Sequence, residues 1–190
     1  MRVAARPTER FFYGWVIVLV GAVLTFLGTG FYSYSRGVFL PSLAEELAGG
    51  SRFEIAMGFS IAAVTSALVA PFIGGILDKY SPKTVIVVGI GFVTGSYLLL
   101  SFCQNLIQFY LIVGLGMGLG MTCMGNLAWH RTIISWFDHW RGRAISLGVL
   151  GASLAGVVMP PLVTSLVEAI GWRSAFVVFA IIVPSILIPL

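Results

Sequence analysis

The stretch GGILDKYSPKTV, residues 74–85, decides the fold because it places charges and turn formers between two long apolar runs. Asp78, Lys79 and Lys83 fall within six positions of a chain that is 58% hydrophobic and only 9% charged. Pro82 can begin a helix, since the first helical residue needs no N–H donor. We therefore predict that this stretch is a short polar turn between two apolar helices.

The composition around this turn excludes an ordinary soluble domain. The mean hydropathy is +1.01. Seven acidic and eleven basic residues among 190 cannot form the polar shell that a soluble core requires. A chain this apolar is typical of membrane proteins. Cys103 and Cys123 both lie in apolar runs and predict neither a disulfide framework nor a metal site, and no cofactor is expected.

A membrane-spanning helix needs about 20 apolar residues, and the chain offers six such stretches. We therefore predict an all-α membrane protein. The predicted spans lie near residues 13–36, 55–77, 83–103, 107–129, 143–166 and 173–190. Residues 1–12 form a predicted cytoplasmic tail, and residues 13–190 form one six-helix transmembrane bundle. The last span ends without a flanking charge, so a C-terminal bundle is expected to be missing from this chain.

Basic residues orient the predicted spans, because cytoplasmic loops of membrane proteins carry an excess of Lys and Arg. With the N-terminus inside, eight basic residues fall on the cytoplasmic side and three on the outer side. The eight are Arg2, Arg6, Arg10, Lys79, Lys83, Arg131, Arg141 and Arg143, and the three are Arg36, Arg52 and Arg173. We expect an integral protein of the bacterial inner membrane, and the net charge of +4 requires no nucleic-acid partner.

The polar turn resembles the signature loop between the second and third spans of the major facilitator superfamily. Gly74, Asp78, Lys79 and Lys83 match that loop, whereas Ser81 stands in place of the usual Gly. In that family the loop is a latch, whose Asp and cations hold two six-helix halves together on the cytoplasmic side. The alternative is that Asp78 faces the positive end of a neighbouring helix and that the lysines are ordinary cytoplasmic anchors.

Further stretches resemble the branch of this superfamily that contains oxalate–formate antiporters and monocarboxylate porters. They are FYGWVIV (12–18), GVFLPSLAEEL (37–47), WFDHWRGRAISLGVLGASLAGVVMPPL (136–162) and GWRSAF (171–176). The sequence departs from the family pattern at Pro82, where a basic residue is often found, and at Arg143, where Leu is usual. The resemblance covers nearly the whole chain, but only the N-terminal half of such a transporter. It implies transport of a small organic anion by alternating access.

Arg36 is a candidate for the substrate pathway, together with the nearby Tyr32 and Tyr34. A charged residue inside a span is costly without a purpose, so Arg36 could bind an anionic substrate through charge-assisted hydrogen bonds. The alternative, which we favour slightly, is that Arg36 snorkels to the outer lipid headgroups. The animal monocarboxylate porters carry a cation near this point, but it aligns with Tyr34, so that role is not transferred to Arg36.

The end of the fourth predicted span, GNLAWHRTIISWF (125–137), supplies further pathway candidates. Asn126, His130 and Arg131 could line the inner half of the pathway, and His130 could relay protons because histidine titrates near neutral pH. We favour the simpler interpretation that Trp129 and Arg131 are interfacial anchors and that His130 lies at headgroup level. No Asp or Glu lies within a predicted span, so these spans contain no carboxylate for proton coupling.

Small residues at helical spacing predict close helix packing, because they let two backbones approach each other. Glycines at alternate positions in GLGMGLG (114–120) suggest such contacts in the fourth span, and further small residues do so in the fifth. A proline pair is expected to break the fifth span near its outer third. The helix-packing candidates are Gly114, Gly118, Gly148, Ala152, Gly156 and Pro160.

These features predict a secondary transporter and not an enzyme. Its expected partners are a small organic anion such as a monocarboxylate, a proton or counter-anion, membrane lipid, and a missing second bundle or a second copy of the chain. One half alone is not expected to catalyse coupled transport. An alternative is a self-contained six-helix protein that pairs with itself as a pore or receptor. A rhomboid-type protease is disfavoured, because Ser153 lacks a histidine on a facing span.

Overall fold

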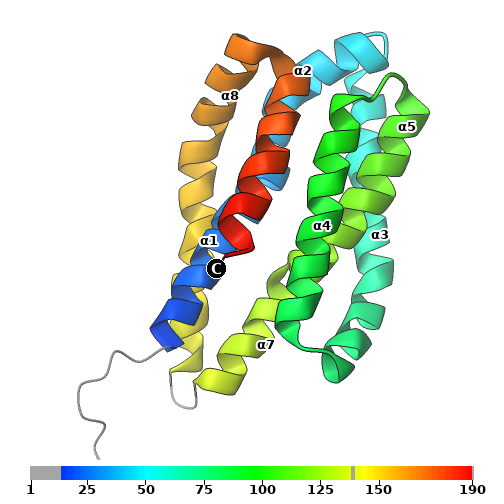
Figure 1. The fold of residues 1–190 in the computed structure, drawn as a ribbon. Helices are drawn as coiled ribbons and strands as arrows, with labels where there is room; N and C mark the ends of the chain where they lie inside the picture. The colour runs from blue at the N-terminus through cyan, green and yellow to red at the C-terminus, as the bar shows by residue number, and fades with distance from the viewer. Residues whose placement is uncertain (1–13, 138–139, 190) are drawn as a thin grey trace, which may run out of the picture.

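The computed structural model describes residues 14–137 and 140–189, and every regular element in that part of the chain is a helix. Within it, five helical segments are long and apolar enough to cross a membrane. They cover Gly14–Leu47, Arg52–Lys79, Pro82–Ser101, Leu106–Ser135 and Arg141–Leu187. Together they form an upright helical bundle (Figure 1). The predicted tail, residues 1–12, lies outside the described residues.

The first segment extends further than the sequence predicts. Its elements in order are α1 (Gly14–Thr29), a π-helical turn η1 (Gly30–Tyr34) and α2 (Arg36–Leu47). The helix continues through α2 beyond residue 36, where the predicted span ends. Burial stabilises the continuation: Phe39 stacks on Phe176 with ring centroids 4.5 Å apart, and Leu43 is fully buried. Arg36 therefore lies within a helical segment and not at its outer end.

The polar turn is shorter than the stretch that predicted it. Helix α3 (Arg52–Lys79) ends and α4 (Pro82–Ser101) begins only three positions later. Ser81 caps α4, since its hydroxyl oxygen accepts a hydrogen bond from the backbone N–H of Thr84 at 3.3 Å. Pro82 occupies the first helical position, as expected.

The fourth segment is interrupted twice. Its elements are α5 (Leu106–Leu111), a second π-helical turn η2 (Ile112–Met117), α6 (Gly118–Met124) and α7 (Asn126–Trp136). Gly125 adopts an extended conformation between α6 and α7, with φ −71° and ψ −171°. Helical structure resumes after this glycine and continues beyond residue 129, where the predicted span ends.

The last segment, α8 (Arg141–Leu187), turns back on itself at Gly171. This glycine has φ 77° and ψ 161°, a conformation that residues with a side chain rarely adopt. Figure 1 shows the chain reverse direction where α8 changes from orange to red. Helical backbone continues through Pro160 and Pro161, so the predicted break at Pro160 is wrong.

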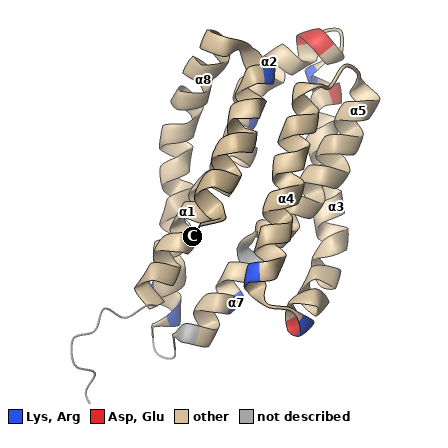
Figure 2. Cartoon of the chain, in the orientation of Figure 1, with Lys and Arg blue, Asp and Glu red and all other residues tan. Residues whose placement is uncertain are grey.

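The core of the bundle forms where α8 packs against α1 and α4. The Thr25 hydroxyl of α1 donates a hydrogen bond to the backbone oxygen of Gly148 in α8 at 2.8 Å. In the same core, Phe31 lies against Phe179, with ring centroids 4.1 Å apart. Charged residues gather at the two ends of the bundle (Figure 2). We name the end at which α3 finishes the Asp78 end, and the opposite end, at which α2 finishes, the Glu46 end.

Candidate functional site

Arg36 begins α2 directly after the π-helical turn and is partly buried among aromatic rings. Its Nε donates a hydrogen bond to the backbone oxygen of Tyr32 at 3.0 Å. Its guanidinium carbon lies 4.0 Å from the ring centroid of Tyr32 and 4.8 Å from that of Phe59, which are cation–π distances. The side chain thus turns back along its own helix instead of reaching outward, as snorkelling to the headgroups would require.

No carboxylate of the described residues forms an ion pair with Arg36. Its one protein hydrogen bond in this part of the chain uses Nε, which leaves the donors of both terminal nitrogens for another acceptor. A guanidinium in apolar surroundings interacts more strongly with an anion than it would in water, because the local dielectric constant is lower. Arg36 is therefore suited to bind a carboxylate.

A cavity of about 20 Å³ lies beside Arg36, which is enough space for one water molecule. Among the described residues, Arg36 is the single charged one that lines it, and the remaining walls are apolar or aromatic. We name it the Arg36 cavity. Its aromatic walls include Tyr32, Phe59, Tyr97, Phe109 and Phe176. The cavity thus combines one positive charge with an apolar wall, which is the chemistry that a small anion with an organic group requires.

Both π-helical turns of the described chain line the Arg36 cavity. Phe31 and Tyr32 come from η1, and Val113 and Met117 come from η2. The turn η1 is closed by the buried Ser35, whose backbone N and hydroxyl oxygen lie 3.2 and 2.9 Å from the carbonyl oxygen five residues earlier. Such turns are rare inside α-helices and frequently occur at functional sites. Their convergence supports this cavity as the candidate site.

The two predicted tyrosines separate in the structure. Tyr32 contacts Arg36, as described above, and is partly buried. Tyr34 lies instead against α8, where a Cβ built on Gly156 would be 3.1 Å from its ring. Its side chain is 42% exposed. The structure therefore brings Tyr32 into the candidate site and does not place Tyr34 there.

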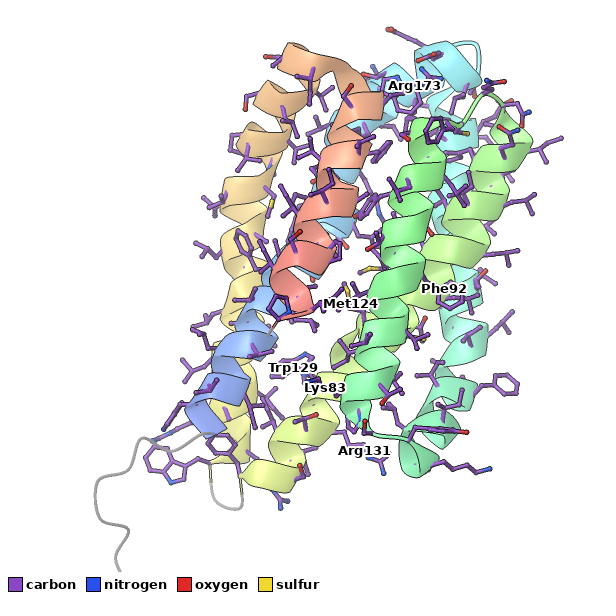
Figure 3. All side chains as sticks on the ribbon, in the orientation of Figure 1. Lys83, Phe92, Met124, Trp129, Arg131 and Arg173 are labelled. Carbon is purple, nitrogen blue, oxygen red and sulfur yellow. The ribbon has the colours of Figure 1, made fainter. Side chains whose placement is uncertain are left out.

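At the Asp78 end, an ion pair joins α3 to α7. Arg131 Nη1 lies 2.6 Å from Asp78 Oδ1, and both side chains are substantially exposed. Asp78 therefore pairs with a side chain and not with the neighbouring helix N-terminus that the alternative interpretation suggested. Among the described residues, Lys79 and Lys83 form no ion pair. Figure 3 shows Arg131 and Lys83 at this end of the bundle and Arg173 at the other.

Trp129 is not an interfacial anchor. It is only 3% exposed and inserts between α1 and α8, where a Cβ on Gly21 would lie 2.6 Å from its ring and a Cβ on Gly148 would also collide with it. The His130 ring packs against Trp129 with centroids 4.6 Å apart, and within the described part of the chain its buried Nε2 has no hydrogen-bond partner. The side chain of Asn126 lies outside the described residues.

At the Glu46 end, one carboxylate connects separate parts of the chain. Glu46 Oε2 accepts a hydrogen bond from Trp172 Nε1 at 2.8 Å, and Glu46 Oε1 pairs with Arg173. Arg173 Nη2 also donates to the backbone oxygen of Cys103 at 2.9 Å. These contacts join the end of α2, the connection between α4 and α5, and the part of α8 after Gly171. Burial raises the pKa of the Cys103 thiol, so this cysteine stays protonated.

We expect Glu46→Gln to lower the thermal stability of the protein modestly. The amide keeps one acceptor for Trp172 but loses the charge that pairs with Arg173. Because both charged side chains are partly exposed, the loss should be about 1 kcal/mol or less. Thermal unfolding in detergent measures it, with Glu45→Gln on the same helix turn as the matched control. Equal melting temperatures for the two variants would contradict a stabilising role.

The alternating glycines of the fourth segment face two different helices. A Cβ on Gly114 would lie 2.7 Å from Ile61, and one on Gly118 would lie 3.0 Å from the backbone oxygen of Ala62, so this pair faces α3. A Cβ on Gly120 would lie 2.7 Å from Val93 of α4. Residues four apart share a helix face, whereas residues two apart lie on nearly opposite faces. The glycines of residues 114–120 therefore let the fourth segment pack closely against both α3 and α4.

The packing face of α8 contains some of the predicted small residues and one further glycine. Gly148 and Ala155 are buried, and Gly151 is buried between them. Ala152, Gly156 and Pro160 are only partly buried. Ala152 and Gly156 therefore flank the contact with α1, and Gly151 lies at its centre, where a Cβ would collide with the backbone oxygen of Ala22.

Sequence reasoning missed Phe59, Tyr97 and Glu46. Phe59 and Tyr97 are ordinary apolar-span residues in the sequence, and nothing in their spacing connects them to Arg36. Nothing in the sequence connects Glu46 to Trp172 or Arg173. The pairing of Arg36 with aromatic residues of other helices requires knowledge of helix rotation, which one sequence does not supply.

Comparison with known families gives one match over almost the whole chain. The family model described as Major Facilitator Superfamily matches residues 17–189.

Individual relatives are distant but similarly extensive. The chain is 24% identical over 176 residues to an uncharacterized MFS-type transporter, YcxA, of Bacillus subtilis, covering 93% of this chain and 43% of that protein. It is 28% identical over 167 residues to human Monocarboxylate transporter 6, covering 88% and 32%. It is 29% identical over 159 residues to the Fujikurins efflux protein of Gibberella fujikuroi, covering 83% and 34%. The chain therefore spans less than half of the length of these relatives.

Proposed function

The chain belongs to the Major Facilitator Superfamily, and from this premise we propose that it forms part of a secondary active transporter of small organic anions such as monocarboxylates. The observation that carries the anion assignment is Arg36, which lines an apolar cavity with unused hydrogen-bond donors and no carboxylate partner among the described residues. A buried cation is costly unless it is compensated, and a substrate carboxylate would compensate it.

The names of the relatives support this assignment only in part. One relative is named a monocarboxylate transporter and another an efflux protein for fujikurins. At these identities a family can change its substrate while it keeps its fold. The Arg36 cavity favours the anion, because an uncharged substrate would leave the guanidinium without a partner.

The two parts of α8 on either side of Gly171 are proposed to cross the membrane separately, which gives six crossings. The Asp78 end is proposed to face the cytoplasm, because a basic excess is expected there. Transport by alternating access then requires a second bundle, either from a longer form of the chain or from a second copy. His130 is a proposed proton site, since its Nε2 has no partner among the described residues.

Uptake by reconstituted liposomes tests the proposal. We expect saturable uptake of radiolabelled acetate or lactate by the complete transporter that contains this bundle. Liposomes with the 190-residue chain alone should show no uptake above protein-free liposomes. Saturable uptake by the chain alone would show that a second copy of the chain, and not a longer form of it, supplies the second bundle. Failure of the complete transporter to take up either acid would overturn the anion assignment.

We expect Asp78→Asn to slow transport about tenfold or less, with little change in substrate preference. The substitution removes the charge that pairs with Arg131 at 2.6 Å, far along the bundle from the Arg36 cavity. An exposed pair contributes little to stability, so the loss should arise from the conformational cycle and not from unfolding. Initial uptake rates measure it, and the matched control is Glu45→Gln, which makes the same change at an exposed carboxylate that forms no ion pair among the described residues. An unchanged uptake rate would show that the loop around Asp78 is an ordinary turn and not a latch.

A further inference from the structure

Most walls of the Arg36 cavity cannot move independently. Tyr97, Phe109 and Phe176 are all at most 5% exposed. Phe176 stacks on Phe39 with ring centroids 4.5 Å apart and on Tyr97 with centroids 6.0 Å apart. Rings packed in this way move only together, because interiors are as dense as organic crystals. The cavity therefore cannot enlarge on this side without repacking the core.

Two partly buried rings form the remaining side of the cavity. Tyr32 accepts the Arg36 hydrogen bond through its backbone oxygen and belongs to the same helical segment, so it cannot withdraw without moving Arg36. Phe59 comes from a different helix, α3, where it is partly buried and meets the buried Phe109 edge-on with ring centroids 5.9 Å apart. The Arg36 hydrogen bond does not involve Phe59, so the Phe59 ring can be removed without changing the bond that orients the guanidinium.

The two rings enclose Arg36 on adjacent sides. Their centroids are 6.5 Å apart and their planes meet at 73°. Rings on opposite faces of a guanidinium would be farther apart, given the distances of 4.0 and 4.8 Å from the guanidinium carbon. Phe59 thus occupies a volume in direct contact with the cation. A bulky organic group attached to a carboxylate bound at Arg36 would have to enter that volume, since the existing cavity measures only about 20 Å³.

We propose that Phe59 sets the size limit of the anion site: the carboxylate of the substrate binds Arg36, and the Phe59 ring excludes bulky organic groups beside it. This inference rests on the proposed function. The native site then takes short-chain monocarboxylates. Removal of the ring creates an apolar space next to the cation, and such spaces bind benzene-sized groups when a large core side chain is truncated. The enlarged site should accept an aromatic carboxylate.

Equilibrium binding of sodium acetate and sodium benzoate tests this inference. Isothermal titration calorimetry is carried out with the transporter in lipid nanodiscs, and empty nanodiscs correct for partition of benzoate into lipid. We expect Phe59→Ala to raise the affinity for benzoate relative to acetate about tenfold or more, as changes of pocket size do elsewhere. Phe59→Leu should give a smaller shift in the same direction, and it covers the case in which the alanine variant folds poorly.

Phe72→Ala is the matched control, because it makes the same change on the same helix at a side chain that is 72% exposed and outside the cavity lining. It should leave the ratio of affinities unchanged. An unchanged ratio in both Phe59 variants, with acetate affinity lowered by Arg36→Gln, would overturn the role of Phe59 and leave the proposed function intact. Acetate affinity that is unaltered by Arg36→Gln would overturn the anion site itself.

Discussion

Gly151→Ala is expected to prevent the bundle from folding, or to destabilise it by about 3 kcal/mol or more. A Cβ at this position would collide with the backbone oxygen of Ala22 and would lie 2.7 Å from the Thr25 hydroxyl. The obstacle is backbone, which cannot rotate away as a side chain can. Helices α1 and α8 would have to separate, and the hydrogen bond from Thr25 to Gly148 would be lost with the contact.

The matched control makes the same substitution in a helix with open space. A Cβ on Gly91 of α4 has no neighbour within 4 Å, so Gly91→Ala should be neutral or stabilising by up to about 1 kcal/mol through helix propensity. Size-exclusion chromatography of fluorescent fusions in detergent, followed by thermal unfolding of whichever variants are monodisperse, measures both. Equal melting temperatures for the two variants would show that α1 and α8 do not need their close approach.

Arg36→Gln is expected to weaken binding of acetate by about 10- to 100-fold, which corresponds to the loss of a hydrogen-bonded charge. Glutamine keeps polar atoms near the cavity but removes the positive charge and the fork of donors. Arg36→Lys should retain part of the affinity, because an ammonium supplies charge without the planar pair of donors. Calorimetric titration with sodium acetate measures all three proteins under identical conditions.

A control must separate loss of the site from loss of the fold, because Arg36 also contacts the rings of Tyr32 and Phe59. Arg52→Gln removes an exposed cation at the start of α3 and should leave acetate binding unchanged. Thermal unfolding of the Arg36 variants shows whether the bundle persists. Unaltered acetate affinity in a folded Arg36→Gln variant would assign the guanidinium to packing alone.

The membrane class of the fold could be predicted from the sequence alone. The bilayer requires about 20 apolar residues per crossing, and this requirement applies along the chain without reference to neighbours. The predicted spans therefore fall on the helical segments of the structure, with errors at the ends. Those errors have a shared cause: helix α2 continues past residue 36 because Phe39 and Leu43 find a core to enter. Family membership was also predictable, because the polar turn carries its motif.

The contacts of the functional residues could not be predicted from the sequence. Arg36 was expected to reach the headgroups, yet its side chain turns back onto Tyr32 and Phe59. Trp129 was expected at the interface, yet it fills the space that two glycines leave between α1 and α8. Each outcome depends on the rotation of one helix relative to another, which apolar composition does not specify.

By itself, the sequence determined that the chain is a helical membrane protein and which family it belongs to, because a bilayer requires long apolar segments and the family motif is local in the sequence. Only the tertiary structure decided that Asp78 pairs with Arg131, that Glu46 joins α2 to α8, and that two π-helical turns meet at Arg36. Lipid is as apolar as the side chains that face it, so burial alone does not orient these helices. Close packing of small residues and a few polar contacts decide which faces meet.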